Sequence, residues 1–187
     1  IKKLAGKGSK VMLTRSMHEI AELSGKIKKT DDLVEVMTKE FIDYYSKNIA
    51  NESTLKDGAL DFLTWCKKNS IMMGVCTNKQ EHLSIDLLKK IKIYHFFDYV
   101  AGGNTFNHNK PDPKHLTDSI EIIGGNQKKS LMIGDSETDG NAANAAGIPF
   151  ILLEDGYTEK NINEISHNHL IRDFVGIEKI VQKYLHH

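Results

Sequence analysis

Three polar segments in this sequence follow apolar stretches, directly or after a short loop. They are Thr77-Asn78-Lys79, Lys110-Pro111-Asp112-Pro113 and Gly134-Asp135-Ser136-Glu137-Thr138-Asp139. A hydroxyl and backbone N–H groups ahead of a helix suit a phosphate oxygen. A lysine can neutralise a phosphoryl group or a carboxylate, and Mg²⁺ prefers one or two carboxylates together with phosphate and water. If the three segments meet, they predict one site for a metal-bound phosphate.

The third segment is the most informative. The apolar run from Leu131 to Ile133 ends in Gly134-Asp135, and a second acid, Asp139, comes four residues later in the first turn of a helix. Asp135 is placed to supply a hard oxygen ligand at the end of a strand. A helix cap would explain Asp135 or Ser136 but gives no reason for Asp139, although a segment that acts only as a cap remains the alternative.

The other two segments also have simpler explanations. Thr77 could cap the next helix and do nothing else. Lys110 could be a solvated surface lysine beside a helix that begins near Pro113. Because the two prolines restrict the backbone around Asp112, we expect Lys110 to project from a stiff turn. The convergence of all three segments is more specific than any one of them.

After residue 51, short apolar strands alternate with amphipathic helices. The predicted strands are Ile71–Cys76, Tyr99–Ala101, Ser130–Ile133, Ile148–Leu153 and His169–Arg172, and the predicted helices are Gly58–Lys68, Glu81–Lys90, Lys114–Ile123, Thr138–Ala146 and Gly176–Tyr184. Strands that are apolar on both faces belong to a parallel sheet covered on two sides. We therefore expect an α/β fold with a doubly wound parallel sheet, whose carboxyl edge gathers the polar segments.

Residues 1–51 show only helical periodicity. Leu13, Met17 and Ile20 repeat at helical spacing, and a second apolar stripe runs from Leu33 to Tyr45. The pair predicts a helical hairpin. We therefore divide the chain into a small helical region, 1–51, and an α/β core, 52–187.

Composition narrows the possible partners and compartment. Twenty-five Lys+Arg balance 25 Asp+Glu, so the formal net charge is zero and the usual argument for nucleic-acid binding is removed. Two cysteines make no disulfide framework, which favours a reducing, cytoplasmic compartment. No apolar run approaches the roughly 20 residues of a membrane span, so we expect no membrane partner. The sequence leaves monomer and homodimer open.

The three segments resemble motifs of the haloacid dehalogenase (HAD) superfamily of phosphatases, in its phosphoglycolate phosphatase branch. Val75-Cys76-Thr77-Asn78-Lys79 is similar to the second motif, Lys110 to Pro113 to the third, and Gly134 to Asp139 to the fourth. The resemblance covers nearly the whole chain. It implies a HAD-like Rossmannoid core, 52–187, with a partial all-helical cap, 1–51.

The resemblance also implies a reaction and a set of roles. The reaction is Mg²⁺-dependent hydrolysis of a small phosphorylated metabolite, with phosphoglycolate as the leading candidate, through an aspartyl-phosphate. Thr77 would hydrogen-bond the phosphoryl group, helped by the backbone at Asn78, and Lys110 would balance charge. Asp135 would bind Mg²⁺, and Asp139 would orient Lys110 or a metal-bound water. In the cap, Lys7 or Arg15 could contact a substrate carboxylate, although a flexible turn at Gly6-Lys7-Gly8 is the simpler alternative.

The sequence departs from the superfamily at its first motif. Asp-x-Asp, which carries the nucleophile and the acid/base group, occurs nowhere in the 187 residues. The central strand that bears it would lie between the strands ending at Cys76 and Ile133, and its loss would leave two apolar edges facing a gap. We therefore expect an upstream segment of at least ~30 residues, the size of a strand and crossover unit. Without it, the chain should have almost no activity.

Three other functions stay open at this point. The chain could be a non-catalytic, phosphate-binding relative that keeps the pocket but has no nucleophile. It could act on nucleotides or sugar phosphates, because enzymes for those substrates share the core motifs. It could be a metal-free dehalogenase of the same superfamily, against which Asp135 and Asp139 argue.

Overall fold

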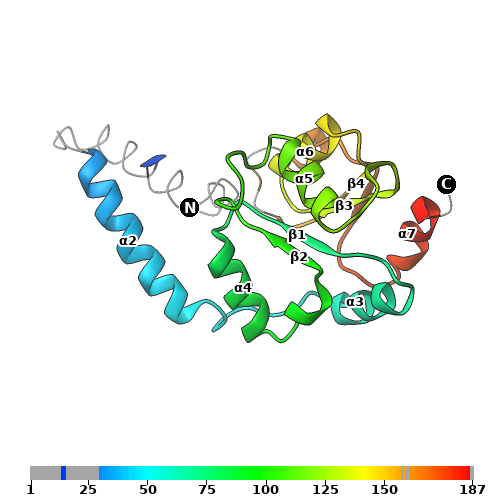
Figure 1. The fold of residues 1–187 in the computed structure, drawn as a ribbon, viewed down its shortest axis with the longest axis horizontal. Coiled ribbons are helices and arrows are strands. Elements are labelled where there is room, and N and C mark those ends of the chain that lie inside the picture. The colour runs from blue at the N-terminus through cyan, green and yellow to red at the C-terminus, as the bar shows by residue number, and fades with distance from the viewer. Residues whose placement is uncertain (1–13, 16–29, 157, 159–160, 186–187) are drawn as a thin grey trace.

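The chain forms an α/β core with one long helix beside it. A computed structural model describes residues 14–15, 30–156, 158 and 161–185 (Figure 1). The helices are α2 (Thr30–Asn48), α3 (Ala59–Lys68), α4 (Glu81–Lys90), α5 (Lys114–Ile122), α6 (Glu137–Ala145) and α7 (Glu178–Leu185). The strands are β1 (Gly74–Cys76), β2 (Tyr99–Ala101), β3 (Met132–Gly134), β4 (Phe150–Leu153) and β5 (His169–Ile171). Every strand and helix predicted after residue 51 is present.

Some boundaries differ from the predicted ones. β1 begins at Gly74 rather than Ile71, β3 covers Met132–Gly134 rather than 130–133, and α6 begins at Glu137 rather than Thr138. Residues 71–73 are apolar but lie outside β1, and the Met73 N–H donates to the Asp98 carboxylate at 2.7 Å. Hydrophobicity locates a strand, whereas pairing sets its ends.

The five strands form two parallel sheets. β1 pairs with β2, and β3, β4 and β5 pair in that order. In the view of Figure 1, β1 lies between β2 and β3, and side chains next to β1 and β3 share one apolar cluster. No described strand pairs with either of them along their facing edges. The parallel α/β class is confirmed, and among the described residues no strand lies between β1 and β3.

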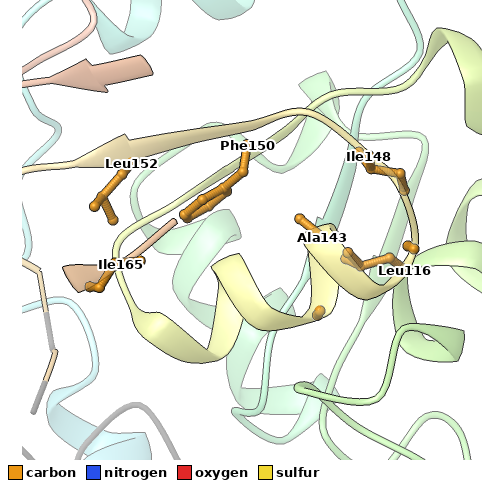
Figure 2. Packing of buried hydrophobic residues seen from close by; sticks show 8 residues of the cluster. Leu116, Ala143, Ile148, Phe150, Leu152 and Ile165 are labelled. Atoms are coloured by element: carbon orange, nitrogen blue, oxygen red, sulfur yellow. The ribbon is translucent and has the colours of Figure 1, made fainter. Parts of the chain in front are cut away.

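Helices cover both faces of the sheets, as expected for a doubly wound core. β4 shows this most clearly, because all four of its residues are buried. Phe150 and Leu152 point into a cluster with Leu116 of α5 and Ala143 of α6 (Figure 2). Ile151 points to the opposite face, toward Phe62 of α3 and Val181 of α7. This alternation makes β4 apolar throughout.

The two sheets are joined by side chains rather than by backbone hydrogen bonds. The cluster under α3 and α7 takes Ile71 and Met73 from the segment entering β1, and it takes Ile133 and Ile151 from β3 and β4. Burial of these side chains holds the two half-sheets, β1-β2 and β3-β4-β5, against each other. It contributes a stabilising free energy of roughly 25 cal/mol per Å² of apolar surface removed from water.

The long helix α2 lies at one side of the core and projects away from it (Figure 1). Two contacts near its carboxyl end join it to the core: Lys79 Nζ donates to the Tyr45 hydroxyl at 2.6 Å, and Lys90 Nζ donates to the Ser46 carbonyl at 3.2 Å. The second predicted helix is therefore present, whereas most of the first lies outside the described residues. None of the described helices is long and apolar enough to cross a membrane.

His115 is an uncharged imidazole sealed inside the core. Its side chain has no exposed surface, and Nδ1 accepts the Lys110 backbone N–H at 3.2 Å. Burial, helped by the positive charge of Lys110, lowers the pKa of His115 from 6.5 to about 4. The ring therefore fixes the turn that carries Lys110 without adding a charge.

Replacing Phe150 with alanine should destabilise the fold strongly, because the ring of this β4 residue is fully buried against α5 and α6. We expect the free energy of unfolding to fall by about 3–5 kcal/mol, the usual cost of deleting a buried phenylalanine ring. Urea denaturation followed by circular dichroism measures it. Tyr44→Ala, at a side chain that is 71% exposed, is the control and should cost far less. Equal losses in the two variants would contradict this packing.

Acid should destabilise the protein through His115. Between pH 6.5 and 4 the unfolded chain binds a proton at this residue that the folded protein excludes, so stability falls as pH drops through that window. His115→Asn keeps an acceptor for the Lys110 N–H but does not titrate. From pH 7 to pH 4, the unmodified protein should lose about 3 kcal/mol more than the variant in urea titrations. Parallel stability curves would show that His115 can be protonated in place.

Candidate functional site

The site is organised around a buried ion pair between Lys110 and Asp139. Lys110 Nζ donates to Asp139 Oδ1 at 2.5 Å, and the two residues are only 8% and 5% exposed. The same ammonium donates to the Cys76 carbonyl at 2.5 Å. Lys110 is therefore not a solvated surface lysine. It joins the carboxyl end of β1 to the first turn of α6, across the space between the two half-sheets.

The amino terminus of α6 has a structural role that the sequence analysis missed. Asp139 Oδ2 accepts the Asp135 N–H at 3.1 Å, the Ser136 N–H at 3.2 Å and the Ser136 hydroxyl at 2.8 Å. Ser136 Oγ accepts the Asp139 N–H in return, so the two residues form a capping box. The expectation that a cap gives no reason for Asp139 was wrong. One carboxylate oxygen caps the helix while the other binds Lys110.

The loop after β1 carries Thr77 and Asn78. Thr77 N–H donates to the Ala101 carbonyl at 2.9 Å, and its hydroxyl oxygen accepts the Lys79 N–H at 3.2 Å. The residue capping α4 is Gln80, so Thr77 is not the helix cap. Asn78 Nδ2 donates to the Lys110 carbonyl at 2.8 Å, which ties this loop to the Lys110 turn.

Asp135 lies directly after β3 and borders a pocket. With Glu154, Asp155 and Thr158 it lines a cavity of about 340 Å³ at the carboxyl ends of β3 and β4. Gly156 is essential to its shape, since a Cβ there would lie 1.8 Å from the Asp135 carbonyl oxygen. Only glycine lets the loop after β4 approach Asp135 this closely.

Asp135 is a candidate ligand for a divalent metal, because its carboxylate is a hard oxygen donor at the end of β3. Asp139 is a weaker candidate, since its two oxygens bind Lys110 and take part in the capping box. No cluster of three or more His, Cys, Asp or Glu side chains in the described part of the chain could form a metal cage. This donor set fits an ion such as Mg²⁺, which takes few protein carboxylates and completes its shell with phosphate and water.

Two further residues were predicted to contact the substrate. Lys7 lies outside the described residues, and Arg15 is an exposed residue in a helical turn. Two further residues shape the site but were not predicted from the sequence. They are His115, which accepts the Lys110 backbone N–H, and Gly156, which packs against Asp135. The acceptor role of His115 depends on a fold contact that no sequence pattern signals, whereas Gly156 follows a strand and could have been found by reading strand ends.

Cys76 is not a nucleophile in this site. Burial raises the pKa of its thiol to about 11, despite the positive charge of Lys110 nearby. A protonated thiol is a poor nucleophile, so Cys76 acts through its backbone carbonyl and as a small packed side chain.

Comparisons with known proteins agree with this geometry. The model of the haloacid dehalogenase-like hydrolase family matches residues 3–153. A phosphoglycolate phosphatase of Mesorhizobium japonicum is 34% identical over 173 residues, 92% of this chain and 74% of that protein. Another, of Agrobacterium fabrum, is 32% identical over 185 residues, 96% of this chain and 77% of that protein.

A solved structure supports the same assignment. The crystal structure of a predicted phosphoglycolate phosphatase from Haemophilus somnus superposes with a TM-score of 0.89 at 27% identity, covering 97% of this chain and 80% of that one. The family match spans most of the sequence, and the matched region holds all three polar segments. The buried Lys110–Asp139 pair and the parallel strands agree with this match. The chain belongs to the haloacid dehalogenase-like hydrolase family.

Proposed function

We propose that this chain is the larger part of a Mg²⁺-dependent phosphatase that hydrolyses a small phosphorylated metabolite of the phosphoglycolate type. The observation that carries the proposal is the buried ammonium of Lys110, held by Asp139 and the Cys76 carbonyl where β1 and β3 end. Relatives named phosphoglycolate phosphatase share about a third of the sequence. A phosphoric monoester hydrolase is the activity that both observations favour.

Catalysis of phosphoryl transfer depends mostly on positioning and charge stabilisation, and each residue of the site would contribute to one of them. Lys110 would balance the negative charge on the phosphoryl oxygens and the nucleophile. The Thr77 hydroxyl and the backbone at Asn78 would hydrogen-bond the transferring group. Asp139 acts through Lys110, because its own two oxygens are already engaged inside the protein.

Asp135 would hold the Mg²⁺ ion. When bound, the metal neutralises charge on the phosphate and helps to orient it. Asp135 suits this role because it lines the pocket at the end of β3, and its backbone N–H is held by Asp139. Asp139 binds both the Asp135 N–H and the Lys110 ammonium, so it links the end of β3 to Lys110.

The nucleophile would come from a strand paired between β1 and β3. Both strands have an unpaired facing edge among the described residues, and Lys110 lies across that opening. A carboxylate oxygen on this strand would attack phosphorus, and the ester oxygen would leave with a proton from a second aspartate. Water would then cleave the aspartyl-phosphate and restore the carboxylate. Residues 1–51 would form part of the cap, and residues 52–187 the rest of the core.

A non-catalytic, phosphate-binding relative is the second candidate. The absence of Asp-x-Asp from the 187 residues is the observation that favours it. The upstream coding sequence separates the two candidates, since a strand bearing Asp-x-Asp is needed only for catalysis.

The polypeptide extended by the coding sequence upstream of Ile1 should release phosphate from 2-phosphoglycolate when Mg²⁺ is present, and chelation should abolish the activity. Asp135→Asn should weaken Mg²⁺ binding at least ~10-fold, measured by calorimetry. Even residues that only hydrogen-bond to a metal's ligands typically change metal affinity by about 10-fold to 100-fold. Asp155→Asn is the matched control at the same pocket, where Asn tolerates the positive φ of 63°.

Nucleotides and sugar phosphates assayed in parallel test the substrate class. Activity that persists without divalent metal, or an extended chain with no Asp-x-Asp, would refute the proposal.

Lys110→Gln should destabilise the 187-residue chain because it leaves the Asp139 carboxylate buried without its cation. Breaking a buried pair in this way costs about 3–5 kcal/mol. The control is Lys67→Gln, which removes a lysine from an ion pair of 2.9 Å whose side chains are 38% and 35% exposed. It should cost about 1 kcal/mol at most. Similar losses in the two variants, measured by urea denaturation, would mean that water reaches the Lys110 pair.

A further inference from the structure

Lys79 carries an ammonium that the proposed chemistry leaves unused. Its Nζ donates to the Tyr45 hydroxyl at 2.6 Å and lies 4.8 Å from the centre of that ring. In the described part of the chain, no carboxylate lies within 4 Å of this ammonium, in contrast to the paired Lys67 and Lys110. An ammonium has three N–H donors, and the phenol accepts one of them. Two donors therefore remain for an anion.

The backbone of Lys79 is fixed to the loop that would hold phosphate. Its N–H donates to the Thr77 hydroxyl oxygen at 3.2 Å, and its carbonyl accepts the Gly103 N–H at 2.8 Å. Thr77 and Lys79 are two residues apart, so their Cα atoms are at most about 7.6 Å from each other. A ligand whose phosphate reaches Thr77 therefore lies beside the backbone from which the Lys79 side chain starts.

Tyr45 holds the ammonium from the side of α2. Its ring stacks on Phe41, one helical turn earlier, with 5.8 Å between ring centres and 13° between the planes. Both rings are half-buried, and the phenol faces the loop after β1. The long helix and the loop thus hold one cation between them, at the junction of the helical region with the core.

We infer that Lys79, positioned by Tyr45, binds a second anionic group of the substrate, a carboxylate at the end opposite the phosphate. This inference rests on the proposed function and adds to it the residue that selects the carboxylate of a phosphoglycolate-type substrate. Lys79 joins Lys7 and Arg15 as a candidate for contact with that carboxylate. A charge-assisted pair of this kind favours an ester that carries a carboxylate over one that does not by about 10-fold to 100-fold.

The test measures binding of two phosphate monoesters to the full chain by calorimetry with Mg²⁺ present. One is 2-phosphoglycolate, and the other is ethyl phosphate, which has a methyl group where the first has a carboxylate. Lys79→Met keeps the apolar stem and removes the ammonium. Lys90→Met is the matched control, since Lys90 also joins the core to α2, through the Ser46 carbonyl, but lies at the far end of α4 from Thr77.

The unmodified chain and Lys90→Met should prefer 2-phosphoglycolate by about 10-fold or more, and Lys79→Met should bind the two esters equally. Tyr45→Phe should reduce the preference less than Lys79→Met, because the ammonium stays but loses its anchor. A preference that survives in Lys79→Met, or an equal loss for both esters, overturns the assignment of Lys79 and leaves the phosphate site intact. Failure of the unmodified chain to bind ethyl phosphate overturns the proposed function, and the assignment with it.

Discussion

The buried pair of Lys110 and Asp139 is the interaction on which the rest of the site depends. A lysine with 8% of its surface exposed must have its charge compensated, because burial of an unpaired ion is costly. Asp139 supplies the opposite charge, and the Cys76 carbonyl supplies a dipole. The need to compensate one cation therefore brings β1, the Lys110 turn and the start of α6 to the same place.

That pair also spans the least complete part of the fold. The two half-sheets share a side-chain core under α3 and α7, but no backbone hydrogen bonds join β1 to β3 in the described structure. The apolar cluster under α3 and α7 sets the separation of the half-sheets. The polar groups of the site lie at the carboxyl ends of the strands. A strand added between β1 and β3 would end beside Lys110, which is where phosphoryl transfer needs a nucleophile.

The helical region and the core contribute different groups to the site, because α2 contacts the loop after β1 whereas the Lys110–Asp139 pair lies within the core. The core fixes the candidate phosphate-binding groups, since Asn78 is hydrogen-bonded to the Lys110 turn and Lys110 and Ser136 are both hydrogen-bonded to Asp139. The helix α2 touches the loop after β1 through Tyr45 and Lys79. A site built in this way can keep its chemistry constant while contacts at the junction select the part of the substrate that does not react.

The sequence alone determined the α/β class, the alternation of elements after residue 51 and the three polar segments, because periodicity and strand-end residues are local properties. Tertiary structure decided the rest. Asp139 is both a helix cap and the partner of Lys110, and sequence analysis missed the first role because it depends on where the Ser136 hydroxyl points. His115 and Gly156 matter through contacts with Lys110 and Asp135, which are five and 21 residues away in sequence. Burial, partner and charge state are properties of a folded neighbourhood, so no spacing of residue types could have revealed them.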